Sequence, residues 1–198
     1  MSDIRVIYGS VPADNIVINK NELAQRLKTN RGFEHSVIDL CIDEFNKVVD
    51  YRYAYIVVPV EFTRENVCNM GFGNIASANL YNVLKGCKTA IILGVTTGIG
   101  VDRLLNRLSV ASASKHFITD AIASAAAESF CDYMDDMLRK CPEKTHRFSP
   151  GYGDLALDIQ PRLLDMLNAS KNLGITINKS LLMTPVKSIT AIMGVYDE

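Results

Sequence analysis

The chain has 198 residues, of which 48% are hydrophobic and 22% charged, and both values are close to the averages of globular proteins. A single compact domain of this length buries roughly two thirds of its unfolded surface, so no disulfide or metal staple is required. The 12 glycines and 6 prolines are too few for collagen or low-complexity disorder. The net charge of -1 disfavours nucleic acid and anionic membrane surfaces as partners.

The cysteines and the N-terminus indicate a reduced, cytoplasmic protein. The five cysteines are odd in number and form no Cys-x-x-Cys motif, so neither a disulfide framework nor a zinc site is expected. The first residues lack the basic start and apolar core of a signal peptide. The apolar runs at 53–60 and 89–95 are shorter than the ~20 residues of a transmembrane helix, so we expect no membrane span.

The first part of the chain predicts short strands and helices. β-branched residues at 4–8 and 16–18 indicate strands, and Asn19 is a suitable N-cap for a helix that runs to about residue 28. An apolar stripe predicts a helix over 36–46. The unbroken apolar run at 53–60 predicts a strand that is buried on both faces.

The middle of the chain predicts two helices that flank a strand, followed by a long helix. The amphipathic pattern at 75–84 indicates a helix that ends at Gly86, and 88–95 predicts a buried strand. A glycine-containing turn then leads into a helix over 101–108. The longest helical pattern spans 120–140 with Thr119 as N-cap, and because its first half contains mainly small residues, we place this helix centrally.

The last third predicts a loop at 147–153, a helix at 159–172 ended by Gly174, and strands at 175–177 and 187–195. Strands and helices mix without strict alternation, and no repeat or linker is visible. We therefore expect an α+β fold, in which a twisted mixed or antiparallel central sheet is flanked by helices in one domain over 1–198.

Several features that suggest a site have simpler explanations. The glycines between residues 94 and 100 match neither a dinucleotide-binding nor a Walker spacing, and they are expected to connect a strand to a helix, with amides that can help line a pocket. The isolated His35, His116 and His146 indicate surface or capping residues, and no metal site is predicted. A group of aspartates near the end of the long helix indicates a solvated helix face. They are Asp132, Asp135 and Asp136.

Glu128 differs from these residues because it lies in the small-residue part of the central helix. A buried carboxylate needs a partner, since an unpaired buried charge costs several kcal/mol or shifts its pKa. Two interpretations remain equally open: a structural ion pair and a cationic ligand.

The segment 147–154 contains the most informative residues of the chain. Pro150 fixes one torsion, whereas Gly151 permits positive φ or close backbone approach, so the loop can present amide groups and hold Tyr152 against a neighbour. Arg147 offers a planar fork that suits a carboxylate or phosphate. The segment is either a loop that binds an anion and a ring, or a rigid turn whose tyrosine closes the core.

These motifs, taken in order, resemble the activation (reactivation) domain of cobalamin-dependent methionine synthase. The shared features are the alanine-rich helix at 120–128 with its glutamate, the Arg147-x-x-x-Gly151-Tyr152 loop, and the Ser-x-x-Met-x-Pro-x-x-Ser pattern at 180–188. The resemblance is strong from about residue 96 to the C-terminus and general before it. Where members of the family usually continue the loop as Gly-Tyr-Pro, this chain has Gly153-Asp154.

The resemblance implies a site for S-adenosylmethionine in a methyltransferase component. In the family, the loop arginine holds the methionine carboxylate, and the loop and the helix glutamate also reach the ligand. The residues implied here are Glu128, Arg147, Ser149, Pro150, Gly151 and Tyr152. The charges agree, because a carboxylate suits an arginine and the ammonium and sulfonium groups suit a glutamate.

The implied activity is the reductive remethylation of cob(II)alamin to methylcobalamin in methionine biosynthesis. Because the chain lacks the corrinoid-binding Asp-x-His-x-x-Gly motif, cobalamin is expected on a partner methionine synthase, with a reductant such as flavodoxin. Three alternatives remain: service to the corrinoid protein of another methyl-transfer system, a non-catalytic S-adenosylmethionine-binding or sensing module, and a purely structural interaction domain.

Overall fold

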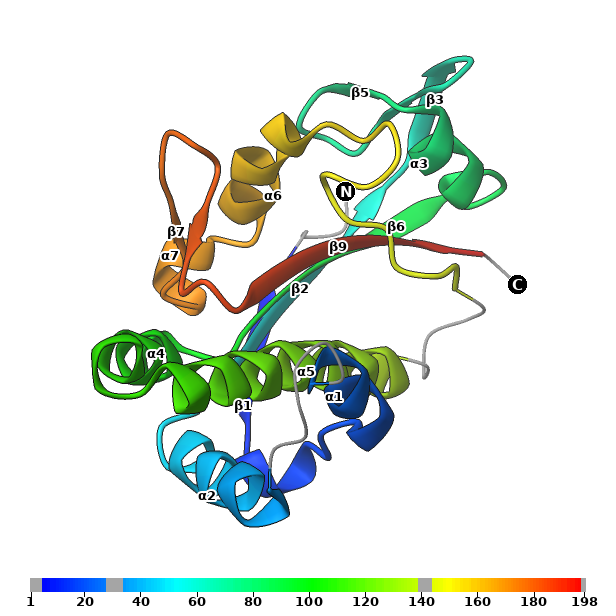
Figure 1. Ribbon diagram of the computed structural model, residues 1–198. Coiled ribbons are helices and arrows are strands. Elements are labelled where there is room, and N and C mark those ends of the chain that lie inside the picture. The colour runs from blue at the N-terminus through cyan, green and yellow to red at the C-terminus, as the bar shows by residue number, and fades with distance from the viewer. Residues whose placement is uncertain (1–4, 28–33, 139–143, 197–198) are drawn as a thin grey trace.

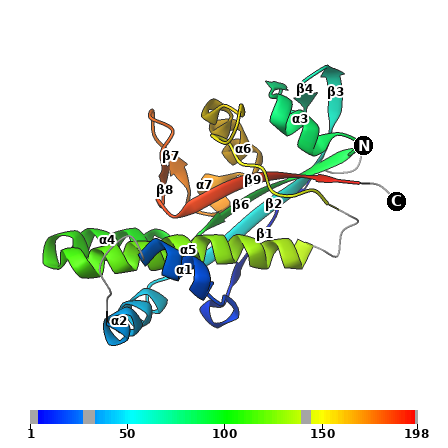
Figure 2. The same cartoon turned by 45° about the vertical axis from the view of Figure 1, so that its right-hand side comes forward.

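The structure is a computed structural model that describes residues 5–27, 34–138 and 144–196. Among these residues, four antiparallel strands in the order β1-β2-β6-β9 form a central sheet between two layers of helices (Figure 1; Figure 2). The strands are β1 (Ile7–Val11), β2 (Tyr51–Pro59), β6 (Thr89–Thr96) and β9 (Ser188–Val195). The predicted α+β class is therefore confirmed, and its sheet is antiparallel.

One face of the sheet is covered by the long central helix and by helices that precede it in the chain (Figure 2). These are α1 (Lys20–Leu27), α2 (His35–Asn46), α4 (Ile99–Ala111) and α5 (Ala113–Met137), with a 3-10 turn at Ala13–Asn15. Helix α5 packs against α1, α2 and α4 as well as β6 and β9. Its small side chains permit this close approach, since Ala123, Ala125 and Ala126 are fully buried.

The other face of the sheet is covered by short helices of the C-terminal half together with α3. They are α3 (Ala78–Leu84), α6 (Gln160–Met166), α7 (Ala169–Asn172) and a 3-10 turn at Leu157–Ile159. Ile56, Ile92 and Ile192 stand opposite one another across β2, β6 and β9 and form a buried row under these helices. Two small antiparallel sheets complete the fold. They are β3 (Glu61–Arg64), β4 (Val67–Asn69) and β5 (Asn74–Ala76), and β7 (Thr176–Ile177) with β8 (Met183–Thr184).

Several predicted elements are confirmed with small shifts. Asn19 caps α1, because its Oδ1 accepts from the backbone N–H groups of Asn21 and Glu22 (3.0 and 3.2 Å). Helix α2 and strands β6 and β9 lie where the apolar patterns predict them. The first strand begins at Ile7 rather than residue 4, which lies outside the described residues. The predicted strand at 16–18 is wrong, because these residues form no strand.

Two predicted helix starts are wrong. Ile75 and Ala76 pair in β5, and α3 begins after Ser77, whose hydroxyl accepts from the N–H of Leu80 (3.0 Å). Helix α5 begins seven residues earlier than predicted, since Ser112 caps it and Ile118 is already buried in the core. Thr119 therefore lies inside the helix rather than at its cap. The predicted end near residue 140 lies outside the described residues.

Two further expectations are corrected. Strand β2 is not buried on both faces, because Val57 is 42% exposed and lies beyond Tyr55, the last residue of β2 that pairs with β1. The helix predicted at 159–172 is broken into α6 and α7 by Asn168, whose φ of +48° turns the chain. Gly174, with φ of +70°, ends α7 as expected.

Cys41, Cys68, Cys87 and Cys131 are buried and free, and Cys141 lies outside the described residues. Within the described ranges, no group of potential ligand side chains could hold a metal ion, and no helix has the length and apolarity to cross a bilayer.

Candidate functional site

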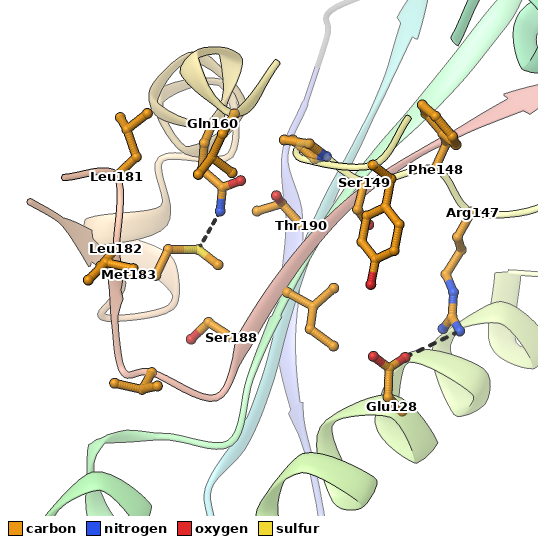
Figure 3. Close-up of a pocket in the computed structure, with 15 residues that line it drawn as sticks. Glu128, Arg147, Phe148, Ser149, Gln160, Leu181, Leu182, Met183, Ser188 and Thr190 are labelled. Carbon is orange, nitrogen blue, oxygen red and sulfur yellow. Dashed lines mark hydrogen bonds and ion pairs between the residues drawn. The ribbon is translucent and has the colours of Figure 1, made fainter. Parts of the chain in front are cut away.

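A cavity of about 540 Å³ opens between the 147–152 loop, β9 and the segment 181–186 that precedes β9 (Figure 3). Its volume lies within the range typical of small-molecule sites. The residues that line it are Glu128, Arg147, Phe148, Ser149, Pro150, Tyr152, Leu157, Gln160, Leu181, Leu182, Met183, Val186, Ser188, Ile189 and Thr190.

The cavity brings together five of the six residues predicted for the site: Glu128, Arg147, Ser149, Pro150 and Tyr152. The sixth, Gly151, has no side chain and does not line the cavity. Its φ is +88°, and its N–H donates to the carbonyl of Leu155 (2.8 Å), so it shapes the turn that presents its neighbours. That these residues bind a ligand stays a prediction.

The loop is held to the edge strand β9 by backbone pairing. Phe148 and Ile192 exchange two N–H···O=C hydrogen bonds (2.9 and 2.8 Å), and Thr145 donates to Gly194 (2.9 Å). Tyr152 is 67% exposed at the cavity, so the interpretation in which the tyrosine closes the core is wrong.

Asp154 anchors the far end of the loop to the start of α3. Its carboxylate accepts from the Ser77 hydroxyl (2.5 Å) and from the N–H groups of Ala78 (2.7 Å) and Asn79 (3.2 Å). The Ser77 hydrogen bond, followed by those from the backbone, lowers the pKa of Asp154 below its ordinary value. The residue that follows Gly153, where the chain departs from the usual Gly-Tyr-Pro sequence, thus ties the loop to a helix terminus.

We expect the Asp154→Ala variant to unfold at a lower temperature than wild type at pH 7. Because the folded-state pKa is lowered, the carboxylate stabilises the fold above its unfolded-state pKa, and this contribution is lost as the pH falls through the folded-state pKa. Thermal unfolding between pH 7 and pH 2 should therefore show the two melting temperatures converging in acid. A difference in melting temperature that stays constant across this pH range would contradict the stabilising role of the Asp154 carboxylate.

Arg147 lies among three carboxylates that α5 presents on one face. Its Nη2 contacts Asp132 Oδ1 at 2.8 Å and Glu128 Oε2 at 3.8 Å, and its Nε contacts Asp135 Oδ2 at 3.4 Å. The predicted solvated face is confirmed for Asp132, whose side chain is 61% exposed, and for Asp136, whereas Asp135 is half-buried. The spacing of four and then three residues aligns these carboxylates with the loop arginine.

One nitrogen of this guanidinium is still available. Among the described residues, Nη1 of Arg147 is buried and has no hydrogen-bond partner. A buried donor without an acceptor destabilises a protein, and a bound water, ion or ligand can supply the missing acceptor.

Glu128 forms the structural ion pair that was one of its two interpretations, and its contact with a cationic ligand stays a prediction. It pairs with Arg147, and its carboxylate also lines the cavity with 41% of the side chain exposed. Figure 3 shows the Glu128 and Arg147 side chains directed toward one another at one end of the cavity. Burial raises the pKa of Glu128, and the positive charge of Arg147 partly offsets this effect.

The opposite wall of the cavity was not predicted. It comprises Gln160 at the start of α6, the 181–186 segment and the first residues of β9. The segment is held by Asp102 of α4, whose Oδ1 and Oδ2 accept from the N–H of Val186 (3.1 and 2.9 Å). Met183 and Ser188 belong to the motif at 180–188, which could have indicated a role for this wall.

The glycines between 94 and 100 connect β6 to α4, as expected, and do not line the cavity. Gly98, with φ of +85°, precedes α4, and its N–H donates to Thr96 Oγ1 (3.1 Å). His35 and His146 are exposed, and His116 is half-buried.

No protein-family model matches the chain, and no curated protein matches it either. Among solved structures, it is similar to the crystal structure of the MetH reactivation domain bound to AdoHcy. The TM-score is 0.69 at 13% sequence identity, and the match covers 98% of this chain and 79% of that one. The chain has the fold of the MetH reactivation domain. The reactivation-domain fold extends over the N-terminal half as well, where the sequence resemblance was only general.

Proposed function

We propose that the protein binds S-adenosylmethionine in the cavity and supports the reductive remethylation of cobalamin on a partner, a cobalamin-dependent methionine synthase. The observation that carries this proposal is the pairing of Arg147 and Glu128 at one end of the cavity, in a fold shared with a domain bound to AdoHcy. Buried free thiols suit the reducing cytoplasm in which such a partner works.

The residues present fit an amino acid group. The unpartnered Nη1 of Arg147 can donate to the ligand carboxylate, and the partly exposed Glu128 carboxylate can accept from its ammonium group. The sulfonium that joins the two halves of the ligand would lie further along the cavity. In this proposal Tyr152, which lines the cavity and is largely exposed, covers the bound ligand.

The role of this chain in the reaction is to orient the methyl donor. A one-electron donor such as flavodoxin reduces the partner's cob(II)alamin, the cobalt takes the methyl carbon as the carbon–sulfur bond breaks, and S-adenosylhomocysteine leaves. Arg147 and Glu128 hold the amino acid end and leave the methyl group free to face the partner.

The deciding experiment combines the protein with a cob(II)alamin-loaded methionine synthase that lacks its own reactivation domain, reduced flavodoxin and S-adenosylmethionine carrying a labelled methyl group. We expect labelled methylcobalamin and an equal amount of S-adenosylhomocysteine. Transfer only to the corrinoid protein of another methyl-transfer system would reassign the partner. Saturable ligand binding without methyl transfer to either corrinoid protein would show that the protein is a binding or sensing module.

The affinity for S-adenosylhomocysteine should depend on pH through Glu128. The ligand ammonium requires the ionised carboxylate of Glu128. Burial raises the pKa of Glu128, so as the pH is lowered the affinity should begin to fall at a higher pH than it would with an ordinary glutamate. Calorimetric titration from pH 8 to pH 4.5 measures this loss. Glu128→Gln should bind about tenfold more weakly at pH 8 and lack this pH dependence. A variant that keeps the wild-type pH profile would contradict the role of Glu128.

A further inference from the structure

The cavity has a second, uncharged end. Glu128 and Arg147 lie at one side in Figure 3, whereas Gln160, Met183 and Ser188 lie at the other, with Thr190 of β9 between them. The walls near this second end carry the aliphatic side chains of Leu181 and Leu182. A ligand that fills the cavity therefore meets ionic groups with one half and neutral polar and apolar groups with the other.

Thr190 carries a hydroxyl that nothing in the described part of the chain satisfies. The residue is only 2% exposed, it lines the cavity, and its Oγ1 has no hydrogen-bond partner. An unsatisfied buried hydroxyl destabilises a protein, and valine would have the same shape without this penalty. The position of the hydroxyl in a cavity wall is explained if a ligand supplies its partner.

Gln160 offers a second polar group to the same space. The residue is 4% exposed, and its Nε2 donates to the sulfur of Met183 at 2.9 Å. A thioether has no hydrogen and can only accept, so the sulfur faces the amide nitrogen and the amide oxygen is turned elsewhere. Figure 3 shows this oxygen turned away from Met183. The contact with Met183 thus fixes an acceptor in a nearly water-free wall.

We infer that Gln160 and Thr190 bind the nucleoside half of the ligand. A nucleoside combines a flat apolar base with amine and hydroxyl donors, which suits an amide oxygen, a hydroxyl and aliphatic walls. The inference rests on the proposed function, because it assigns one half of S-adenosylmethionine to each end of the cavity. Gln160 and Thr190 would set the specificity for the nucleoside, whereas Arg147 and Glu128 set that for the amino acid.

The test uses two ligands that share the nucleoside with its 5′-sulfur and differ in the amino acid group. S-Adenosylhomocysteine carries both halves, and 5′-methylthioadenosine lacks the amino acid group. Gln160→Leu and Thr190→Val should each weaken both ligands by the same factor, about tenfold, which is the effect of one hydrogen bond to a buried group. Arg147→Ala should weaken S-adenosylhomocysteine alone and leave 5′-methylthioadenosine unchanged.

Two variants provide matched controls. Thr119 is also fully buried with an unpartnered Oγ1, but it lies in α5 outside the cavity lining, so Thr119→Val should leave both affinities unchanged. Gln25→Leu makes the same change as Gln160→Leu at an exposed position of α1. Thermal unfolding without ligand adds a second readout, since Thr190→Val should melt no lower than wild type while it binds less.

The outcomes separate the inference from the proposed function. If wild type binds S-adenosylhomocysteine but Gln160→Leu and Thr190→Val bind both ligands normally, the inference is overturned and the proposed function stands. The same holds if these variants weaken S-adenosylhomocysteine but not 5′-methylthioadenosine. If wild type binds neither S-adenosylmethionine nor S-adenosylhomocysteine, with or without the corrinoid partner, both are overturned.

Discussion

Arg147→Ala should bind S-adenosylhomocysteine about 10- to 100-fold more weakly than wild type in a calorimetric titration. A charge-assisted, forked contact with a carboxylate contributes about 1.5–3 kcal/mol, and each 1.4 kcal/mol corresponds to a factor of ten. The guanidinium is well placed for such a contact, because it is mostly buried and one of its nitrogens is unpartnered. Unchanged affinity would show that the loop is not part of the binding site.

Three variants separate ligand binding from the ion pairs on α5. Arg147→Lys keeps the charge but loses the fork, so it should regain only part of the affinity. Asp132→Asn removes the shortest ion pair of Arg147 and should bind at least as tightly as wild type, since Asp132 competes with the ligand for the guanidinium. Arg107→Ala changes an exposed arginine that pairs with Glu44 at 3.7 Å, and it should have no effect on binding.

Asp102→Ala should lower the free energy of unfolding by about 2 kcal/mol and also weaken the ligand, because a part-buried N–H would lose its acceptor. The carboxylate fixes Val186, and Val186 lines the cavity. Burial raises the pKa of Asp102, and the Val186 N–H and the charge of Lys187 partly offset this shift. Urea unfolding at pH 7 measures the change in stability, and the calorimetric titration measures the binding.

The controls for Asp102 use the same neighbourhood. Asp102→Asn keeps an oxygen acceptor and removes the buried charge, so it should retain most of the stability. Asp120→Ala removes the other carboxylate near Lys187, which it contacts at 2.7 Å, but this residue is 47% exposed. The loss should therefore stay below about 1 kcal/mol. Equal losses for Asp102→Ala and Asp120→Ala would show that the two hydrogen bonds to Val186 do not hold the wall.

Residues with strong local constraints were predictable from the sequence. The loop with Arg147 and Pro150 was recognised because torsional restriction and a fixed charge act over a few residues. Glu128 was singled out because a carboxylate among alanines of a central helix needs a partner, and the structure supplies Arg147. The buried strands β6 and β9 were predictable because short apolar runs bounded by turns are typical of buried strands.

The parts that depend on distant contacts were not predictable. The wall formed by Gln160, Met183 and Thr190 joins α6, β8 and β9, which no local pattern brings together. Strands β3–β5 were missed because each is only three or four residues long. Ser112 was overlooked as the cap of α5 because Thr119, seven residues later, has the same chemistry and adjoins the alanine-rich run.

The pairing of Phe148 with Ile192 also covers part of the edge of the central sheet. Strand β9 is the last strand of the central sheet, and the stretch that carries Arg147 covers part of its outer edge through Phe148 and Thr145. An uncovered strand edge is a template on which another chain can add a strand. A substitution that detaches this stretch would thus create an aggregation-prone edge as well as a damaged binding site.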